Sequence, residues 1–236
     1  MNILAIDTST ESCSVALLVG EQLLDRSELL PKRHAEHVLP MAESLLAEAG
    51  LARTQLDGIA VGRGPGAFTG VRLAVSVAQG LAFALDLPLV TVSSLAALAM
   101  DAPADDADVL AVIDARMGEI YAGTFHRSKG GLVEAIGDEC VCKPDALVLP
   151  DAAAWNVIGS GWGEYADMLA AAWPSAPRWA EADHYPQARQ VIRLAVREFA
   201  AGRTLSPEQA LPVYLRDHVA LTLRERGKPV PQAPAG

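Results

Sequence analysis

The sequence has few cationic residues and few cysteines. Lysine and arginine number 19 against 29 acidic residues, which gives a formal net charge of −10. A protein that binds nucleic acid on its own usually presents a basic surface, so we expect a partner to supply most contacts to any RNA. Cys13, Cys140 and Cys142 match neither a zinc spacing nor the redox C-x-x-C motif. They are typical of structural thiols in a reducing compartment.

The sequence predicts neither a targeting segment nor a membrane anchor. No charged segment followed by a long apolar stretch opens the chain, so we expect no signal peptide. Asp86 and Pro88 close the longest apolar run, which we therefore predict to be too short for a membrane span. The 236 residues suit one large domain or two of about 100–120 residues each. The sequence predicts a cytoplasmic protein that does not contact a membrane.

The nucleotide-binding motifs are incomplete. Residues 62–72 read Gly-Arg-Gly-Pro-Gly-Ala-Phe-Thr-Gly-Val-Arg and lie between an apolar strand and an apolar helix. This order can direct backbone N–H groups at an anion. No Lys-Ser/Thr follows the glycines, however, and Thr69 stands where a dinucleotide-binding motif would have its last glycine. The segment predicts either an anion site at Gly64 and Gly66 or a sharp turn between strand and helix, and we favour the turn.

Two halves of the chain share one pattern. Apolar runs at residues 3–6 and 109–113 each end in an aspartate, Asp7 or Asp114, and each is followed by a polar bend and a returning strand. Residues 101–108 form an acidic, alanine-rich connector between the halves. This pattern predicts a duplicated α/β unit.

The pattern of apolar and turn residues predicts the strands and helices of both units. Apolar runs bounded by turn residues predict strands, and apolar positions at helical spacing predict helices. The predicted strands are 3–6, 13–18, 23–29, 56–61, 89–92, 109–113, 120–125 and 155–158, and the helices are 33–49, 71–85, a short one from Ser93 or Ser94 to Met100, 165–173 and 188–201. We predict a tight turn at 159–161. The domains are therefore an N-terminal unit over 1–100, a C-terminal unit over 101–225 and a disordered tail over 226–236.

Asp7 and Asp114 would end their strands at the mouth of a cleft between the two units. There they could hold hydrated magnesium and a nucleotide, or each could cap its own hairpin turn through backbone N–H groups. Ser9 stands where a glycine would let phosphate oxygens come close, which favours the capping role. His34 and His37 share a helix face but lack a third ligand at a useful spacing, so we predict no metal site.

The helix that follows the glycine-rich segment is apolar on two sides. Its predicted core side carries Val71, Ala74, Val75, Ala78, Leu81, Ala82 and Leu85. A second stripe carries Leu73, Val77, Gly80 and Ala84, and the first helix has a flank of His34, His37, Met41 and Ser44 beside its own core face. A helix that is apolar on two faces must bury each face against another part of a protein. We expect the second cover to be another polypeptide chain, since large exposed apolar stripes rarely go unused.

The sequence resembles the bacterial TsaB (YeaZ) family in four segments that occur in the same order: residues 3–10, 62–72, 113–121 and 212–216. The resemblance covers nearly the whole chain. It implies the duplicated actin-like ATPase fold, with two RNase H-like units around a cleft. It also implies a non-catalytic subunit of the machinery that makes threonylcarbamoyladenosine beside the anticodon of tRNA.

The resemblance implies partners as well. TsaD, the catalytic paralogue, would form a heterodimer with this chain, and the P-loop ATPase TsaE would join them, with tRNA contacted only through the complex. No intrinsic cofactor is implied, although ATP or ADP and magnesium could enter the assembled complex. Partner contact is assigned to these residues: His34, Met41, Leu73, Val77, Gly80 and Ala84.

Three other interpretations stay open. An ATP-dependent small-molecule kinase of the same superfamily would turn over ATP unaided, but it expects a glycine where Ser9 stands. A metalloprotease would need a histidine-rich metal site that the sequence does not have. A homodimer could use the same apolar stripe when the chain is alone.

Overall fold

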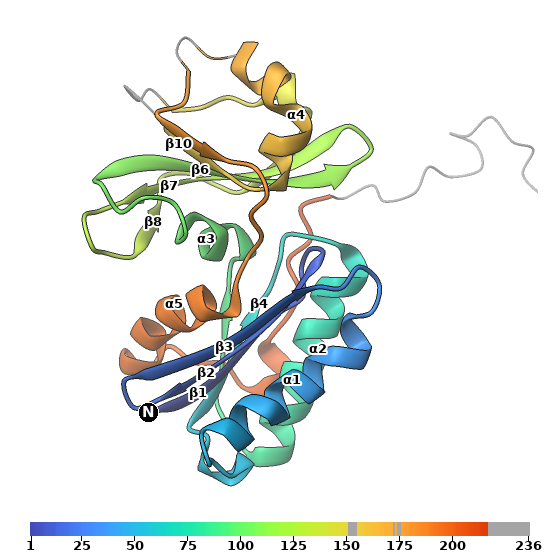
Figure 1. Ribbon diagram of the computed structural model, residues 1–236, viewed down its shortest axis with the longest axis vertical. Coiled ribbons are helices and arrows are strands. Elements are labelled where there is room, and N and C mark those ends of the chain that lie inside the picture. Colours follow the sequence, from blue (N-terminus) through green and yellow to red (C-terminus); the bar gives the residue numbers. More distant parts are fainter. Residues whose placement is uncertain (151–154, 172, 174–175, 217–236) are drawn as a thin grey trace, which may run out of the picture.

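The computed structural model describes residues 1–216 except 151–154, 172, 174 and 175. It contains two β-sheets, one above the other, with helices on the faces of both (Figure 1). The expected α/β class is therefore confirmed. The predicted tail over 226–236 lies outside the described residues.

The first sheet has the strand order β3-β2-β1-β4-β5. The strands are β1 (Asn2–Asp7), β2 (Ser12–Val19), β3 (Gln22–Leu29), β4 (Gly58–Gly62) and β5 (Leu89–Val92). β1, β2 and β3 form an antiparallel meander, and β4 and β5 add parallel to β1. Two helices, α1 (His34–Glu48) and α2 (Phe68–Leu85), make the crossovers between them.

The second sheet repeats this arrangement. Its strands are β6 (Ala107–Arg116), β7 (Glu119–Arg127), β8 (Val133–Ala135), β9 (Cys140–Cys142), β10 (Trp155–Ile158) and β11 (Trp179–Glu181). Their order is β11-β10-β6-β7-β8, and β9 also pairs with β7. As in the first sheet, an antiparallel hairpin leads, and two later strands add parallel to its first strand. The duplication that the two aspartate-ended strands predict is present in the topology.

Helices cover the sheets in layers (Figure 1). α1 and α2 lie on one face of the first sheet, while α3 (Ser94–Ala99) and α5 (Ala188–Ala200) lie between the two sheets. α4 (Ser160–Ala171) covers the outer face of the second sheet. Three apolar clusters fill the spaces between these layers, and the middle one joins both sheets through α3 and α5. Burial of this joint core holds the two units together.

α5 packs against the first sheet although it follows the second unit in the sequence. It contacts β1, β2, β4 and β5. Gly58 on β4 makes room for it, because a Cβ there would lie 2.5 Å from the Phe199 ring. Further on, Leu205 forms an antiparallel bridge with Leu89 of β5. The division at residue 100 stays a prediction, but α5 and the segment after it belong with the first sheet by contact.

Several local features differ from the sequence predictions. The predicted turn at 159–161 is instead the start of α4, which begins at Ser160 and has a non-helical residue at Tyr165. The cap before α3 is confirmed, because Ser93 Oγ accepts a hydrogen bond of 3.1 Å from the Ala96 N–H.

α2 corrects the expectation that no segment reaches membrane-spanning length. Its 18 residues are long and apolar enough to cross a bilayer, by length and composition alone, and it is the one such helix among the described residues. It packs on the first sheet, however, and buries these residues: Gly70, Val71, Ala74, Val75, Ala78 and Ala82. Core helices commonly meet the same length and composition criterion, so this is weak evidence for a membrane span.

Candidate functional site

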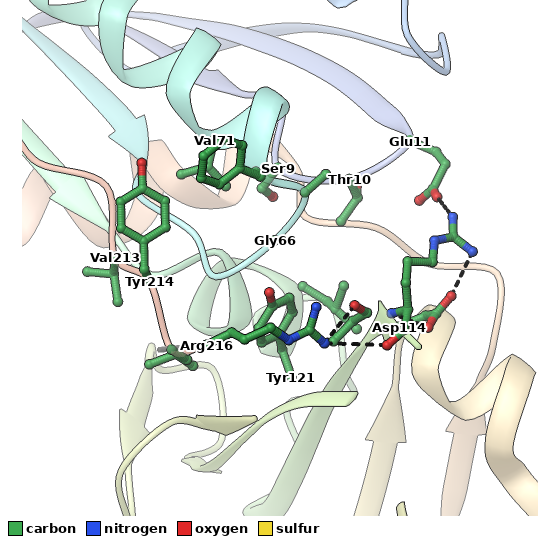
Figure 2. A pocket seen from close by; sticks show the side chains of 16 residues that line it. Ser9, Thr10, Glu11, Gly66, Val71, Asp114, Tyr121, Val213, Tyr214 and Arg216 are labelled. Atoms are coloured by element: carbon green, nitrogen blue, oxygen red, sulfur yellow. Dashed lines mark hydrogen bonds and ion pairs between the residues drawn. The ribbon is translucent and has the colours of Figure 1, made fainter. Parts of the chain in front are cut away.

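A cleft of about 330 Å³ lies between the two units (Figure 2). The turn after β1 contributes Ser9, Thr10 and Glu11, and the glycine-rich segment contributes Gly66. The opposite wall comes from the C-terminal end of β6, which carries Asp114. The C-terminal segment 213–216 closes one side, where the figure shows Tyr214 and Arg216.

Asp7 does not line this cleft. Its side chain is fully buried, and both carboxylate oxygens already have partners. Oδ1 accepts hydrogen bonds from the Ser9 N–H at 2.8 Å and from Ser9 Oγ at 2.6 Å, while Oδ2 accepts one from Ser94 Oγ at 2.9 Å. Burial raises the pKa of Asp7, and these hydrogen bonds oppose the shift. The arrangement fits a buried turn cap better than a ligand for magnesium.

The glycine-rich segment packs directly on the turn after β1. A Cβ on Gly66 would overlap the Ser9 carbonyl, and one on Gly70 would overlap the Thr8 carbonyl. The Ala67 N–H donates to the Ser9 carbonyl oxygen at 2.7 Å. Glycine is needed here because the two backbones meet with no room for side chains.

Two N–H groups at the start of this segment have partners in the protein. The Arg63 N–H donates to the Val92 carbonyl oxygen at 2.8 Å, and the Gly64 N–H donates to Ser94 Oγ at 3.2 Å. Gly64 has a φ of 89°, a conformation that other residues rarely adopt. At Gly64 the geometry therefore favours the turn, and an anion site at Gly66 stays a prediction.

Asp114 does line the cleft, but a cation occupies its carboxylate. Arg116 Nη1 donates to Asp114 Oδ2 at 2.7 Å, and the Arg116 N–H donates to Oδ1 at 2.8 Å. The same guanidinium forms an ion pair with Glu11 across the cleft, which Figure 2 shows by dashed lines. A magnesium ion would have to displace this guanidinium. Asp7 and Asp114 therefore do not fit a shared magnesium–nucleotide site in this chain.

Arginine and tyrosine side chains of the cleft were missed by the sequence analysis. Arg216 Nη2 donates to the Ala115 carbonyl oxygen at 3.1 Å and pairs with Glu119 Oε2 at 2.5 Å. Arg72 Nε donates to the Tyr214 hydroxyl at 2.6 Å. The one signal for this wall was the resemblance of residues 212–216 to a family motif, because nothing local shows that this segment returns to the cleft.

The residues assigned to partner contact fall into two groups. His34 and Met41 are only 8% and 6% exposed, so the chain itself covers most of both side chains, and their assignment as contact residues stays a prediction. Leu73 and Val77 are half-buried, and Gly80 and Ala84 are exposed. Phe83, which the stripe did not include, is 74% exposed beside them.

A second depression of about 560 Å³ lies between the N-terminal ends of α1 and α2. His34 lines it from α1, and Phe68 and Leu73 line it from α2. His34 Nε2 lies 3.3 Å from the Glu11 carbonyl oxygen, which fixes the ring at the edge of the depression. Across the residues that the structure describes, no three His, Cys, Asp or Glu side chains gather closely enough to hold a metal ion.

Comparison with known proteins decides the family. A family model described as "TsaD: tRNA N6-adenosine threonylcarbamoyltransferase" matches residues 27–221. The "tRNA threonylcarbamoyladenosine biosynthesis protein TsaB" of Escherichia coli (strain K12) is 39% identical over 225 residues, which cover 93% of this chain and 96% of that protein. The chain belongs to the TsaB (YeaZ) family. The TsaB of Haemophilus influenzae is 38% identical, with 93% of this chain and 95% of that protein covered.

A solved structure of the TsaB (YeaZ) family has the same fold. The structure titled "YeaZ from Pseudomonas aeruginosa" superposes with a TM-score of 0.84 at 46% sequence identity, and the match covers 91% of this chain and 99% of that chain. Together with the family model and the two repeated sheets, this confirms the duplicated actin-like, RNase H-like fold.

Proposed function

We propose that this chain is a non-catalytic subunit of the assembly that makes threonylcarbamoyladenosine in tRNA, and that it acts by forming a heterodimer with TsaD. The names of its relatives support the pathway. The engaged carboxylates of Asp7 and Asp114 support a role without nucleotide chemistry in its own cleft. Nucleotide and magnesium, where the assembly uses them, bind through other subunits.

The observation that carries this proposal is the outer side of α2, formed by Leu73, Val77, Gly80, Phe83 and Ala84. We call these five residues the α2 face. Phe83 is 74% exposed, although burying a side chain of its size contributes about 1.5–3 kcal/mol of stabilisation. Gly80 has no atom within 4 Å of an added Cβ, and Ala84 is exposed next to it. Small residues beside an exposed aromatic ring let a second helix approach closely.

A partner of the same fold suits this surface. Because the TsaD family model matches most of this chain, TsaD shares the helix pair that corresponds to α1 and α2. Two related helix pairs can pack about a pseudo-two-fold axis, with the same face used on both sides. In this proposal TsaE and tRNA join through the heterodimer, and a homodimer through the α2 face is what the chain forms when TsaD is absent.

Ala84→Arg tests the proposal. It adds a long cation to the C-terminal end of the α2 face, beside Phe83, so we expect co-purification with TsaD to fall at least about tenfold. Ala200→Arg is the matched control, since Ala200 is exposed in α5 on the other face of the first sheet. Equal recovery of TsaD with both variants would overturn the proposed interface.

A reconstituted assay tests the division of roles. tRNA modification is measured with an activated threonylcarbamoyl donor, TsaD, TsaE and this chain, omitting one protein at a time, and we expect no product without this chain and none from this chain alone. ATP turnover by the isolated chain with magnesium would instead support the small-molecule kinase. A sizing column with and without TsaD shows whether a homodimer gives way to the heterodimer.

A further inference from the structure

Two aromatic rings lie side by side at the cleft between the two units. Phe68 begins α2, Tyr214 belongs to the C-terminal segment, and the centroids of their rings are 5.8 Å apart. Both residues line the cleft, and they are 48% and 46% exposed. Folding therefore brings two rings from distant parts of the sequence to one place and leaves each of them partly in contact with water.

Arg72 holds the two rings together. Its guanidinium carbon lies 3.6 Å from the centroid of the Phe68 ring and 5.3 Å from that of the Tyr214 ring. Its Nε donates a hydrogen bond of 2.6 Å to the hydroxyl of Tyr214, which Figure 2 shows at this side of the cleft. A guanidinium over a ring is attracted by the electrons of the ring, so the three side chains hold one another in place. We call Phe68, Arg72 and Tyr214 the aromatic platform.

The aromatic platform also offers a positive charge. The two carboxylates that line the cleft, of Glu11 and Asp114, both pair with Arg116. Arg72 is exposed, and no carboxylate within the described part of the chain pairs with it. Exposed ring surface and an available cation therefore occur at one site, in a chain whose formal net charge is −10.

We propose that the aromatic platform binds an unpaired base of a single-stranded RNA segment. Every base has a π-face that stacks on an aromatic ring, and an arginine beside the ring can contact a phosphate of the same strand. The cleft of about 330 Å³ lies at the low end of the range for small-molecule sites, roughly 300–1,000 Å³, so it suits one base or nucleoside. The choice of RNA rests on the proposed function, because the relatives are named for a tRNA modification.

A protein partner is the competing occupant, because Phe68 also borders the depression between α1 and α2. The position of the aromatic platform at a cleft, with a cation stacked on its ring, favours RNA over an apolar protein surface. Binding that depends mainly on stacking also needs few phosphate contacts, which suits an acidic chain. In the assembly, this contact adds to those that the partner makes with the phosphates.

Fluorescence anisotropy of the full chain with a labelled single-stranded oligoribonucleotide tests the aromatic platform. We expect saturable binding that Phe68→Leu and Tyr214→Leu each weaken at least about fivefold, the loss typical of one stacked base. Tyr214→Phe keeps the ring and should keep most of the affinity. Phe83→Leu is the matched control, since it makes the same change to an exposed ring of α2 that lies outside the cleft.

Arg72→Gln tests the cation of the aromatic platform. The logarithm of the affinity for a single strand falls with the logarithm of the salt concentration, with a slope of about −0.7 for each phosphate contact. We therefore expect the slope for this variant to be shallower by about 0.7, as well as a lower affinity. A variant with the affinity and the salt dependence of the wild type would overturn the phosphate contact.

Two further measurements separate RNA from the other occupants. Recovery of TsaD is measured with Tyr214→Leu, and we expect it to be unchanged. Loss of TsaD with unchanged affinity for RNA would assign the aromatic platform to the protein interface and overturn the proposal. AMP that displaces the labelled strand as well as the unlabelled strand does would indicate a free nucleotide, and would overturn it too.

The oligoribonucleotide titration needs neither TsaD nor tRNA modification, so its failure is distinct from failure of the proposed function. Absence of saturable binding, or equal affinity in the wild type and Tyr214→Leu, would overturn the RNA site. Either result would leave the heterodimer standing, because Ala84→Arg tests that interface separately.

Discussion

At the scale of single residues, the glycines of this chain have opposite roles. Gly66 lies where a Cβ would overlap the backbone carbonyl of Ser9, whereas Gly80 lies within α2 with open space around it. We expect Gly66→Ala to lower the free energy of unfolding by about 3 kcal/mol, because neither backbone can move aside freely. Gly80→Ala should raise it by about 0.5–1 kcal/mol, because alanine is the better helix former.

Urea unfolding of both variants checks this pair of predictions. Gly80→Ala is the matched control, since it makes the same chemical change at a position without a neighbour. A Gly66→Ala variant as stable as the wild type would mean that the glycine-rich segment does not pack on the β1–β2 turn.

Asp7 predicts a pH dependence of stability. Its carboxyl titrates near 3.8 in the unfolded chain, and burial raises this pKa in the folded chain. Between the two values the folded state binds more protons, so the contribution of Asp7 to stability grows as the pH falls. We therefore expect the wild type to gain stability relative to Asp7→Asn as the pH is lowered from 7 toward 4.

The comparison with Asp7→Asn is necessary because other carboxyls act in the opposite direction. Ion pairing and hydrogen bonds lower the pKa of Asp101 and of Glu198, so their contributions are lost on acidification. Chemical unfolding of the wild type and of Asp7→Asn at several pH values isolates the contribution of Asp7 to the free energy of unfolding. A constant difference between them would contradict a raised pKa for Asp7.

At the scale of elements, the sequence identified those with strong local patterns. The strands at 13–18, 23–29 and 89–92 carry apolar runs bounded by turn residues, and α1 and α2 carry apolar positions at helical spacing. The strands β8, β9 and β11 have three residues each and too little pattern to detect. α4 was placed too late because Gly159, Ser160 and Gly161 are typical turn residues, yet the helix starts among them.

The position of an element in space is harder to predict than its existence. The periodicity at 188–201 predicts α5, but no local signal shows that it returns to the first sheet. The apolar stripe in the sequence placed His34 and Met41 on an outer flank of α1. The buried face of α1 is wider than this stripe and includes both residues. Asp7 was placed correctly at a strand end, but its burial depends on Ser94, which is distant in sequence.

The two helices that flank the first sheet differ in what they present outward. α2 turns Phe83, Gly80 and Ala84 to the surface, whereas α5 presents Arg189 and Arg193. An apolar surface suits a permanent protein partner, so α2 rather than α5 carries the proposed interface.

At the scale of the whole molecule, the C-terminal segment joins the two units. Gln79 Nε2 on α2 donates to the carbonyl oxygens of Pro207 and Ala210 at 3.0 and 2.9 Å. The Val213 N–H donates to the Arg63 carbonyl oxygen at 2.9 Å. Arg216 then reaches the C-terminal end of β6 in the second unit. The segment crosses the cleft as a strap, and Arg216 is its contact with the second unit.

Arg216→Gln tests this strap. The Arg216 side chain is only 18% exposed, and the substitution removes its ion pair with Glu119 and its hydrogen bond to the Ala115 carbonyl oxygen. We therefore expect the free energy of unfolding to fall by about 1–2 kcal/mol. The units should also move apart, which a pair of fluorophores on the two units measures as lower energy transfer. Arg26→Gln is the control, because its pair with Glu48 lies exposed within the first unit and contributes about 0–1 kcal/mol. An Arg216→Gln variant that matches this control in stability and in energy transfer would mean that the joint core between the sheets, through α3 and α5, fixes the cleft without the strap.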